Sequence, residues 1–146
     1  MTGETGRVRR AIDVVREIYE THERRDTARF AELLAEDVCW HTAEGHPLRG
    51  DGPWIGRDTV VEQIANPLYG DWDGYLTHVE ELIDAGDRVI SLGRYRGTYR
   101  PTGRTLDAEV CTIFTVRDGL VTEFRQFTDT AQFRWVMGAD PDPRSR

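Results

Sequence analysis

The sequence has few cysteines and no long apolar run. Cys39 and Cys111 are the only two cysteines among 146 residues. Each falls within a stretch that reads as a β-strand, and neither has the spacing of a redox motif, so we expect buried free thiols rather than a disulfide or a metal pair. No segment approaches the roughly 18–20 consecutive apolar residues that span a bilayer. Because the amino terminus also lacks the apolar run of a secretory signal, we expect a cytoplasmic protein.

Positive charge is outweighed by negative charge in this chain. The 26 acidic and 19 basic residues give a formal net charge of −7. This balance repels a phosphate backbone and an anionic membrane surface, so neither nucleic acid nor membrane is an expected partner. No repeat, low-complexity run or linker divides the chain. We therefore expect a single domain over residues 1–146, with an ordered core at about 6–138 and a frayed PDPRSR end.

The first half of the chain carries helical patterns. Apolar residues recur at helical spacing and predict an amphipathic helix over residues 5–24. A short second helix is expected to begin near Asp26 or Thr27, since both are good capping residues. A third helix fits residues 57–65, and Asn66-Pro67 is expected to end it.

Strand patterns dominate from Tyr75 onward. The stretches YLTHVEELID and DRVISLGRYRGTY, followed by two strands within residues 104–128, are separated by glycine-containing turns, which predicts consecutive antiparallel pairs. An earlier strand begins at about Val38 and leads into a loop rich in glycine and proline, a kind of loop that often lines a site. Helices followed by a curved antiparallel meander predict an α+β domain.

Two neighbouring strands have an apolar face that neutral polar side chains interrupt. Thr112 lies in line with Phe114 on one strand, and Gln126 lies in line with Phe124 on the next. Such a face is typical of the wall of a ligand cavity rather than of a sealed core. In the alternative interpretation, Thr112 and Gln126 only satisfy each other or the backbone.

Aromatic residues add further candidates for ligand contacts. Tyr19 and Tyr95 occupy inward positions, where a phenol can donate a hydrogen bond to a carbonyl or enolate oxygen. Trp40 and Trp54 flank the glycine and proline loop and are suited to stack on a flat substrate, and Thr42 shares the face of Trp40. In the alternative interpretation these aromatic residues only pack in the core, which is the more frequent role of such side chains.

Titratable groups that could act as a base are scattered. Asp129 is a candidate general base, but D-T-A-Q also matches a capping box at the start of the last helix. His41, Glu44 and His46 form an H-x-x-E-x-H pattern across a strand end and a loop, which does not place three ligands on one helix face. We therefore expect no metal site there. His22 stands alone in the sequence.

Several strings of the sequence resemble a known family. AELLAEDVCWHT, PLRGDGPWIGRDTV, GDRVISLGRYRGTYRPTGR and FTVRDGLVTEFRQFTDTAQF resemble the SnoaL-like, ketosteroid isomerase-related branch of the nuclear transport factor 2-like superfamily. The resemblance runs from Val8 to about Met137. It implies a cone-shaped α+β barrel, in which N-terminal helices pack on a curved antiparallel sheet around the substrate, and usually a homodimer through the outer sheet face. The superfamily hosts cyclases, isomerases, dehydratases, epoxide hydrolases and binding modules.

The resemblance also implies that the usual ionisable groups are replaced. SnoaL-type polyketide cyclases place an acid–base Asp at the position of Gln126 and an assisting His at that of Thr112. The Asp–Arg–Asp triad of limonene-epoxide-hydrolase relatives corresponds to Gly93, Tyr95 and Gln126, which disfavours that chemistry.

For ketosteroid isomerases, the resemblance places the oxyanion-hole Tyr at Tyr19, a protonated Asp at Thr112 and the base Asp at Thr42. This sequence therefore keeps the hydrogen-bond donors of the ketosteroid isomerase site but not its base. Because proton abstraction beside a carbonyl needs a titratable group, a base would have to come from the substrate or from one of the remaining candidates, which are His41, Glu44, His46, Glu109 and Asp129.

The sequence thus predicts a cofactor-independent isomerase, cyclase or dehydratase acting on an apolar polyketide-, terpenoid- or steroid-like metabolite, with no metal. A carrier of hydrophobic ligands and a structural dimerisation module are the alternatives. The candidate catalytic residues are Asp129, Tyr19, His41 and Thr112. The candidate substrate-binding residues are Trp40, Thr42, Trp54, Tyr95, Phe114, Phe124 and Gln126.

Overall fold

The computed structural model describes residues 8–140, and helix α1 (Ala11–Arg24) begins the fold. Its inward stripe, which includes Val14, Val15 and Ile18, is fully buried, as the helical spacing predicts. The expected helix start at residue 5 lies outside the described residues. Val8 precedes the helix and is 60% exposed, so it adds nothing to the buried stripe that holds α1 in place.

Helix α2 (Thr27–Glu32) follows and is capped by Asp26, whose carboxylate accepts a hydrogen bond from the Arg29 amide at 3.0 Å. This cap was predicted. Strand β1 (Leu34–His41) begins four residues earlier than the expected Val38, because Leu34 already pairs with Val121 of β6 in a parallel ladder.

The third helical region is longer than predicted. Helix α3 (Arg57–Val60) passes through a π-helical turn (Val61–Ala65) into α4 (Asn66–Asp71). Asn66-Pro67 therefore does not end the helix. Pro67 lies in the first turn of α4, directly after the wide π turn.

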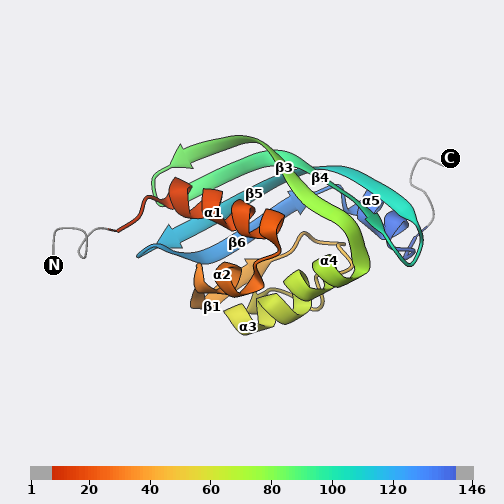
Figure 1. Cartoon of the computed structure of the whole chain (residues 1–146), viewed down its shortest axis with the longest axis horizontal. Coiled ribbons are helices and arrows are strands. Elements are labelled where there is room, and N and C mark those ends of the chain that lie inside the picture. Colours follow the sequence, from red (N-terminus) through yellow and green to blue (C-terminus); the bar gives the residue numbers. More distant parts are fainter. Residues whose placement is uncertain (1–7, 141–146) are drawn as a thin grey trace.

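The six strands form one curved, open sheet in the order β2-β1-β6-β5-β4-β3, with the helices α1 to α4 on its concave side (Figure 1). The remaining strands are β2 (Trp54–Ile55), β3 (Trp72–Ala85), β4 (Arg88–Tyr99), β5 (Arg104–Arg117) and β6 (Leu120–Thr128). β3 to β6 pair antiparallel in sequence order, as predicted, and β1 pairs with β6 in parallel.

Irregular pairing between β3 and β4 bends the sheet. The register shifts between Asp73 and Leu76 and again between Val79 and Glu81, and such bulges increase local curvature. A side chain at Gly93 would place its Cβ only 2.2 Å from the His78 carbonyl oxygen, so the strands can approach this closely only with glycine there.

Helix α5 (Thr130–Val136) covers one end of the sheet, and its Phe133 is fully buried with Trp72, Tyr75 and Tyr95. A second cluster, centred on Phe30, Trp40 and Phe114, fills the other end below α1 and α2. The expected frayed PDPRSR segment, residues 141–146, lies outside the described residues.

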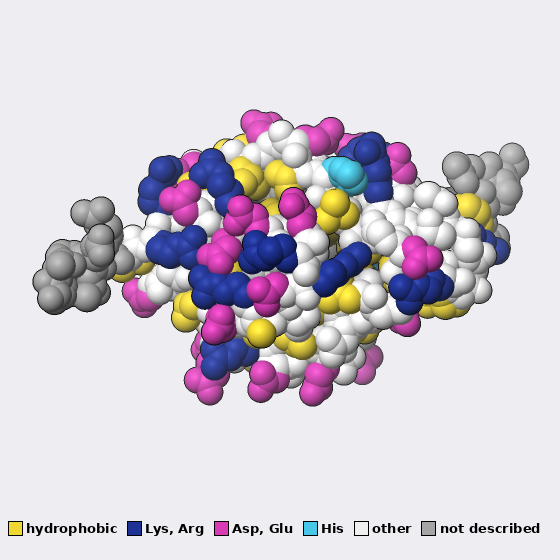
Figure 2. Space-filling model, viewed as in Figure 1, with side chains coloured by type: hydrophobic (Ala, Val, Ile, Leu, Met, Phe, Trp, Pro, Cys, Tyr) yellow, Lys and Arg dark blue, Asp and Glu magenta, His cyan; other side chains and the backbone are white. Residues whose placement is uncertain are grey.

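The surface in view carries interspersed acidic and basic side chains (Figure 2). Glu17 binds both Arg9 at 2.7 Å and Arg29 at 2.6 Å. These hydrogen bonds lower the pKa of the Glu17 carboxyl to about 2, so it stays charged throughout the neutral range. Across residues 8–140 no helix has both the length and the apolar character needed to cross a membrane.

Candidate functional site

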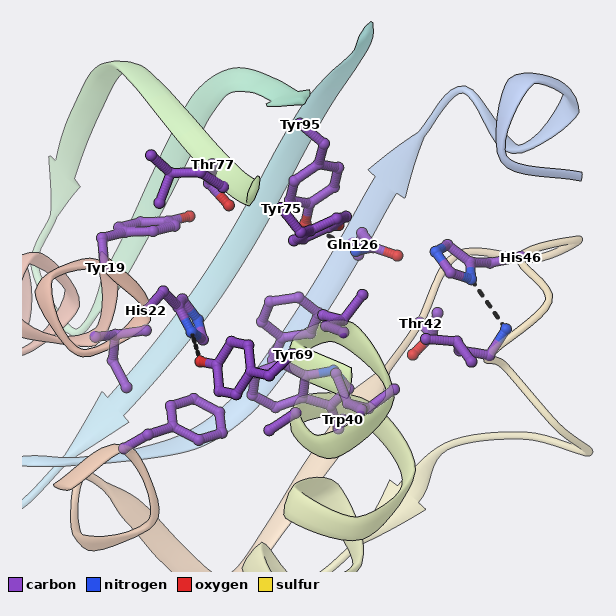
Figure 3. A pocket seen from close by; sticks show the side chains of 18 of the residues that line it. Tyr19, His22, Trp40, Thr42, His46, Tyr69, Tyr75, Thr77, Tyr95 and Gln126 are labelled. Atoms are coloured by element: carbon purple, nitrogen blue, oxygen red, sulfur yellow. Dashed lines mark hydrogen bonds between the residues drawn. The ribbon is translucent and has the colours of Figure 1, made fainter. Parts of the chain in front are cut away.

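A narrow cavity lies between the concave face of the sheet and the helices α1 and α4 (Figure 3). Its volume is about 50 Å³, room for on the order of three or four waters. A larger ligand therefore requires lining side chains to move. Most of the wall is aromatic or aliphatic, and its residues are Ile18, Tyr19, His22, Phe30, Trp40, Thr42, His46, Leu48, Ile64, Ala65, Leu68, Tyr69, Tyr75, Leu76, Thr77, Tyr95, Phe114, Phe124 and Gln126.

Three neutral polar side chains form a row across the concave face. Ser91, Thr112 and Gln126 are register partners on β4, β5 and β6, and all three are buried. The Tyr19 hydroxyl donates to Ser91 Oγ at 2.8 Å. Gln126 Nε2 donates to the Tyr95 hydroxyl at 2.8 Å, while Gln126 Oε1 accepts the Ala43 amide at 3.1 Å. The row therefore holds two phenols in place.

Thr112, a predicted catalytic residue, is buried and is not part of the cavity wall. Burial raises the pKa of Tyr95 to about 12 and that of Tyr19 further still, and hydrogen bonds, from Gln126 for Tyr95, from Ser91 for Tyr19 and from Thr112 for both, only partly offset this rise. Both phenols consequently remain protonated at neutral pH and keep their capacity to donate a hydrogen bond.

His22 and Tyr69 form a close pair in the cavity wall. His22 Nδ1 lies 2.6 Å from the Tyr69 hydroxyl oxygen, and no hydrogen bond within residues 8–140 engages the other ring nitrogen, Nε2. Burial, with a smaller contribution from Arg25, lowers the pKa of His22 to about 4, while burial raises that of Tyr69 to about 12. Both side chains are therefore neutral at pH 7.

His46 is a second neutral imidazole at the opposite end of the cavity, beside Gln126 (Figure 3). Its Nδ1 accepts the Leu48 amide at 3.0 Å, so the proton of the neutral ring lies on Nε2. The ring packs on Phe133 with 4.2 Å between centroids. Burial lowers its pKa to about 4, so His46 acts as a neutral donor at Nε2.

Thr42 contributes a hydroxyl that has no protein partner. The residue is 3% exposed and lines the cavity, and its Oγ1 makes no hydrogen bond within the described part of the chain. Buried polar groups are normally paired. A group inside the cavity, whether a water or a ligand oxygen, is the natural partner for this hydroxyl.

The structure brings most of the predicted substrate-binding residues together. The cavity wall includes Trp40, Thr42, Tyr95, Phe114, Phe124 and Gln126, and also Tyr19 from the predicted catalytic residues. Trp40 stacks on Phe124 with 3.6 Å between centroids, so its face is already occupied. Trp54 is not in the wall, because its indole N–H donates to the Leu48 carbonyl at 2.9 Å and its ring packs against the core.

The structure places four of the five predicted bases outside the cavity. Asp129 is exposed and absent from the cavity wall, and His41 points to the outer side of the sheet, where Nε2 lies 3.3 Å from the Glu123 carboxylate. Glu44 and Glu109 are exposed. His46 alone among the five named bases lines the cavity, so the H-x-x-E-x-H residues do not converge.

Sequence reasoning missed His22 and Tyr69. A signal for His22 was present, since it follows Ile18 and Tyr19 by four and three residues, the spacing that keeps side chains on one helix face. Tyr69 lies beyond Pro67, where the helix was expected to end.

Replacing Asp129 separates its capping role from any catalytic role. The Asp129 carboxylate accepts the Gln132 amide at 3.1 Å and the Gln132 side-chain amide at 3.3 Å. We expect Asp129→Ala to lower the free energy of unfolding by about 1 kcal/mol and Asp129→Asn to retain most of it. Urea unfolding measures both, and equal losses in the two variants would contradict the capping role.

Replacing Gln126 should destabilise the protein because it leaves buried groups unpaired. In Gln126→Leu the Ala43 amide and the Tyr95 hydroxyl both lose a partner, and we expect a loss of about 1–3 kcal/mol in urea unfolding. Tyr95→Phe is the matched control and should cost less, because Ala43 keeps its acceptor. A Gln126→Leu protein as stable as the parent would show that these hydrogen bonds contribute nothing.

Comparison with known proteins agrees with this architecture. The chain is 34% identical to an NTF2-like protein of Burkholderia thailandensis, over 88% of this chain and 98% of that one, with a TM-score of 0.82. An NTF2-like protein of unknown function from Burkholderia pseudomallei is 28% identical over 86% and 95% of the two chains, with a TM-score of 0.76.

TerC, in a structure co-crystallized with polyporic acid, is 25% identical over 88% of this chain and 98% of its own, with a TM-score of 0.76. No curated protein matches the sequence. The model of the SnoaL-like domain matches residues 15–124, which is most of the chain. Fold and sequence therefore agree with the family resemblance of the sequence. The chain belongs to the SnoaL-like domain family and has the NTF2-like fold.

Proposed function

We propose that this protein is a cofactor-independent enzyme that moves a proton within a small, largely apolar metabolite, such as a polyketide-, terpenoid- or steroid-like ketone. The reaction would be an isomerisation, a cyclisation or a dehydration. One observation carries the proposal: the His22–Tyr69 pair, 2.6 Å apart, lies in the wall of a mostly apolar cavity. A proton acceptor and a proton donor thus face the same enclosed space.

The pair can relay a proton without forming a buried charge. With the proton of His22 on Nδ1, Nε2 accepts a proton from the substrate carbon while Tyr69 gives its own proton to the substrate oxygen. In the same step the Nδ1 proton passes to Tyr69, so neither an imidazolium nor a phenolate forms, and the products are an enol, a neutral imidazole with its proton on Nε2, and a neutral phenol. This route agrees with a His22 pKa of about 4, because an imidazolium that persisted at this site would be strongly disfavoured.

Other polar groups of the wall would orient the substrate. The protonated Tyr19 and Tyr95 phenols donate hydrogen bonds where negative charge develops on an oxygen, and Gln126 fixes the position of the Tyr95 hydroxyl. The unpaired Thr42 hydroxyl offers a further contact. In this proposal His22 and Tyr69 move the proton, because Asp129 and His41 do not line the cavity.

The similarity to TerC supports a small organic ligand, since that protein was co-crystallized with polyporic acid and matches this chain over nearly its whole length. Flat molecules with polar oxygens suit a cavity that combines aromatic walls with a few hydrogen-bond donors.

A non-catalytic carrier of hydrophobic ligands is the second candidate. It is favoured because the cavity wall, within residues 8–140, contains no carboxylate, a group that serves as the base beside a carbonyl in several isomerases. A carrier would bind the same ligands and return them unchanged.

A thermal-shift screen followed by mass spectrometry tests the proposal. Cyclic ketones, epoxides, phenolic polyketides and fatty acids are the probes, and a ligand at 100 times its dissociation constant should stabilise the fold by about 2.7 kcal/mol. Conversion of a stabilising ligand to an isomer or a dehydrated product supports the enzyme. Binding of hits without chemical change on long incubation supports the carrier instead, and the absence of any hit contradicts both.

We also propose that two copies associate through the outer sheet face, as the family resemblance implies. Ile55 and Phe127 are apolar side chains on that face and are 55% and 52% exposed. Their burial against a second copy would remove apolar surface from water.

A further inference from the structure

Three side chains of different chemistry converge on the outer face of the sheet, on the side opposite the cavity. Cys39 and His41 flank the inward Trp40 on β1, so both point outward. Glu123 on β6 is the register partner of Cys39. Cys39 Sγ lies 3.2 Å from His41 Nε2, and Nε2 lies 3.3 Å from a Glu123 carboxylate oxygen. All three donor atoms lie within 4.8 Å of one another.

Hydrogen bonding alone does not account well for this arrangement. Both contacts use the same atom, Nε2 of His41. In the neutral imidazole, Nε2 either carries one hydrogen or offers one lone pair, so it cannot fully serve a thiol and a carboxylate at once. A cation, by contrast, engages a sulfur, a nitrogen and an oxygen that face a common point.

We propose that Cys39, His41 and Glu123 form a three-ligand site for a divalent transition metal, with Zn²⁺ the best match. Thiolate sulfur, imidazole nitrogen and carboxylate oxygen are the three protein ligand types of zinc. The separations of 3.2 and 3.3 Å are close to those between ligands of a tetrahedral ion with bonds of about 2.0–2.3 Å.

The site would have an open coordination position. Three protein ligands leave the fourth tetrahedral position for water, as in zinc sites that are not purely structural. Of the three ligands, His41 also lines a hollow, together with Glu44, Arg49 and Arg125, through which solvent can reach the His41 side of the site.

Arg125 opposes the metal. It is the register partner of His41, and its guanidinium lies 4.0 Å from the Glu123 carboxylate. A fixed positive charge at this distance repels a cation and competes for the carboxylate. Arg125→Gln should therefore tighten metal binding, an effect opposite to that expected for a residue that only supports the fold.

Isothermal titration of the full chain with zinc sulfate tests this site. We expect one ion per chain, and a loss of affinity of about 100-fold or more in each of Cys39→Ala, His41→Ala and Glu123→Gln, because even outer partners of a metal site change affinity by 10–100-fold. Cys111→Ala and His78→Ala are the matched controls, since each removes the same side-chain type elsewhere, and neither should change the affinity.

Titration with Co²⁺ adds a readout of the sulfur ligand. The parent chain should develop a sulfur-to-cobalt charge-transfer band that Cys39→Ala lacks and Cys111→Ala retains. Circular dichroism of each variant confirms that it is folded. Absence of zinc binding by the parent chain overturns the proposal, and so does zinc binding that survives in Cys39→Ala and His41→Ala. Neither result bears on the cavity, which lies on the other side of the sheet.

Discussion

Lowering the pH from 7.5 to 5 should reduce the free energy of unfolding by about 4 kcal/mol through His22 and His46 together. In the folded protein the pKa of each ring is about 4, against an ordinary value of 6.5. Below pH 6.5 the two rings bind protons in the unfolded chain but not in the folded protein. The stabilisation that comes from their neutral burial is therefore complete above pH 6.5 and is lost as the pH falls toward 4. Each ring accounts for about 2 kcal/mol at pH 5.

Urea unfolding at both pH values measures this effect. His22→Gln and His46→Gln should each remove about half of the pH dependence in this window. The Glu17 carboxyl, with a pKa of about 2, loses its stabilising contribution mainly below this window. Parent and histidine variants with the same pH dependence would show that the two rings are not buried as neutral groups.

His22→Gln should lower kcat/KM for the substrate found in the screen by about 10²–10⁴-fold, the usual contribution of a positioned acid or base. Glutamine is close in size to histidine but cannot exchange a proton near neutral pH. Tyr69→Phe should cause a comparable loss, because it removes the donor of the same relay while keeping the ring. The double variant should be little worse than either single one, since the two residues act as a unit.

The dissociation constant of the ligand separates chemistry from binding in this experiment. It should change little in His22→Gln, whereas a purely structural role would weaken binding and turnover together. Asp129→Asn and His41→Ala should retain parental turnover, because neither residue lines the cavity. Full turnover in His22→Gln and Tyr69→Phe would refute the relay, and a loss confined to Asp129→Asn would restore Asp129 as the base.

Periodicity alone was sufficient to predict much of the fold and part of the site. The alternation along β5 and β6 placed Thr112, Phe114, Phe124 and Gln126 on the concave side, where the structure has them. These positions are set by local backbone geometry, and local geometry can be read from a sequence. Alternation along β1 likewise puts His41 on the sheet face that Trp40 does not occupy. The absence of His41 from the cavity could therefore be predicted from the pattern.

The His22–Tyr69 pair was not visible, because it depends on tertiary structure. The two residues are 47 positions apart. Tyr69 lies on α4, a helix that Asn66-Pro67 was expected to exclude, and the π-helical turn that lets the chain continue has no reliable local signal. The lack of a hydrogen-bond partner for the Thr42 hydroxyl within residues 8–140 and the convergence of Cys39, His41 and Glu123 likewise depend on neighbouring strands and loops.

A crystal structure of the protein with the strongest ligand from the screen tests the central claim most directly. We predict that the ligand lies between the concave face of the sheet and α1 and α4, with an oxygen within hydrogen-bonding distance of Thr42 Oγ1 or of the Tyr69 hydroxyl. A ligand bound elsewhere on the molecule, with the cavity between Tyr19, Tyr69 and Gln126 unchanged, would contradict the account.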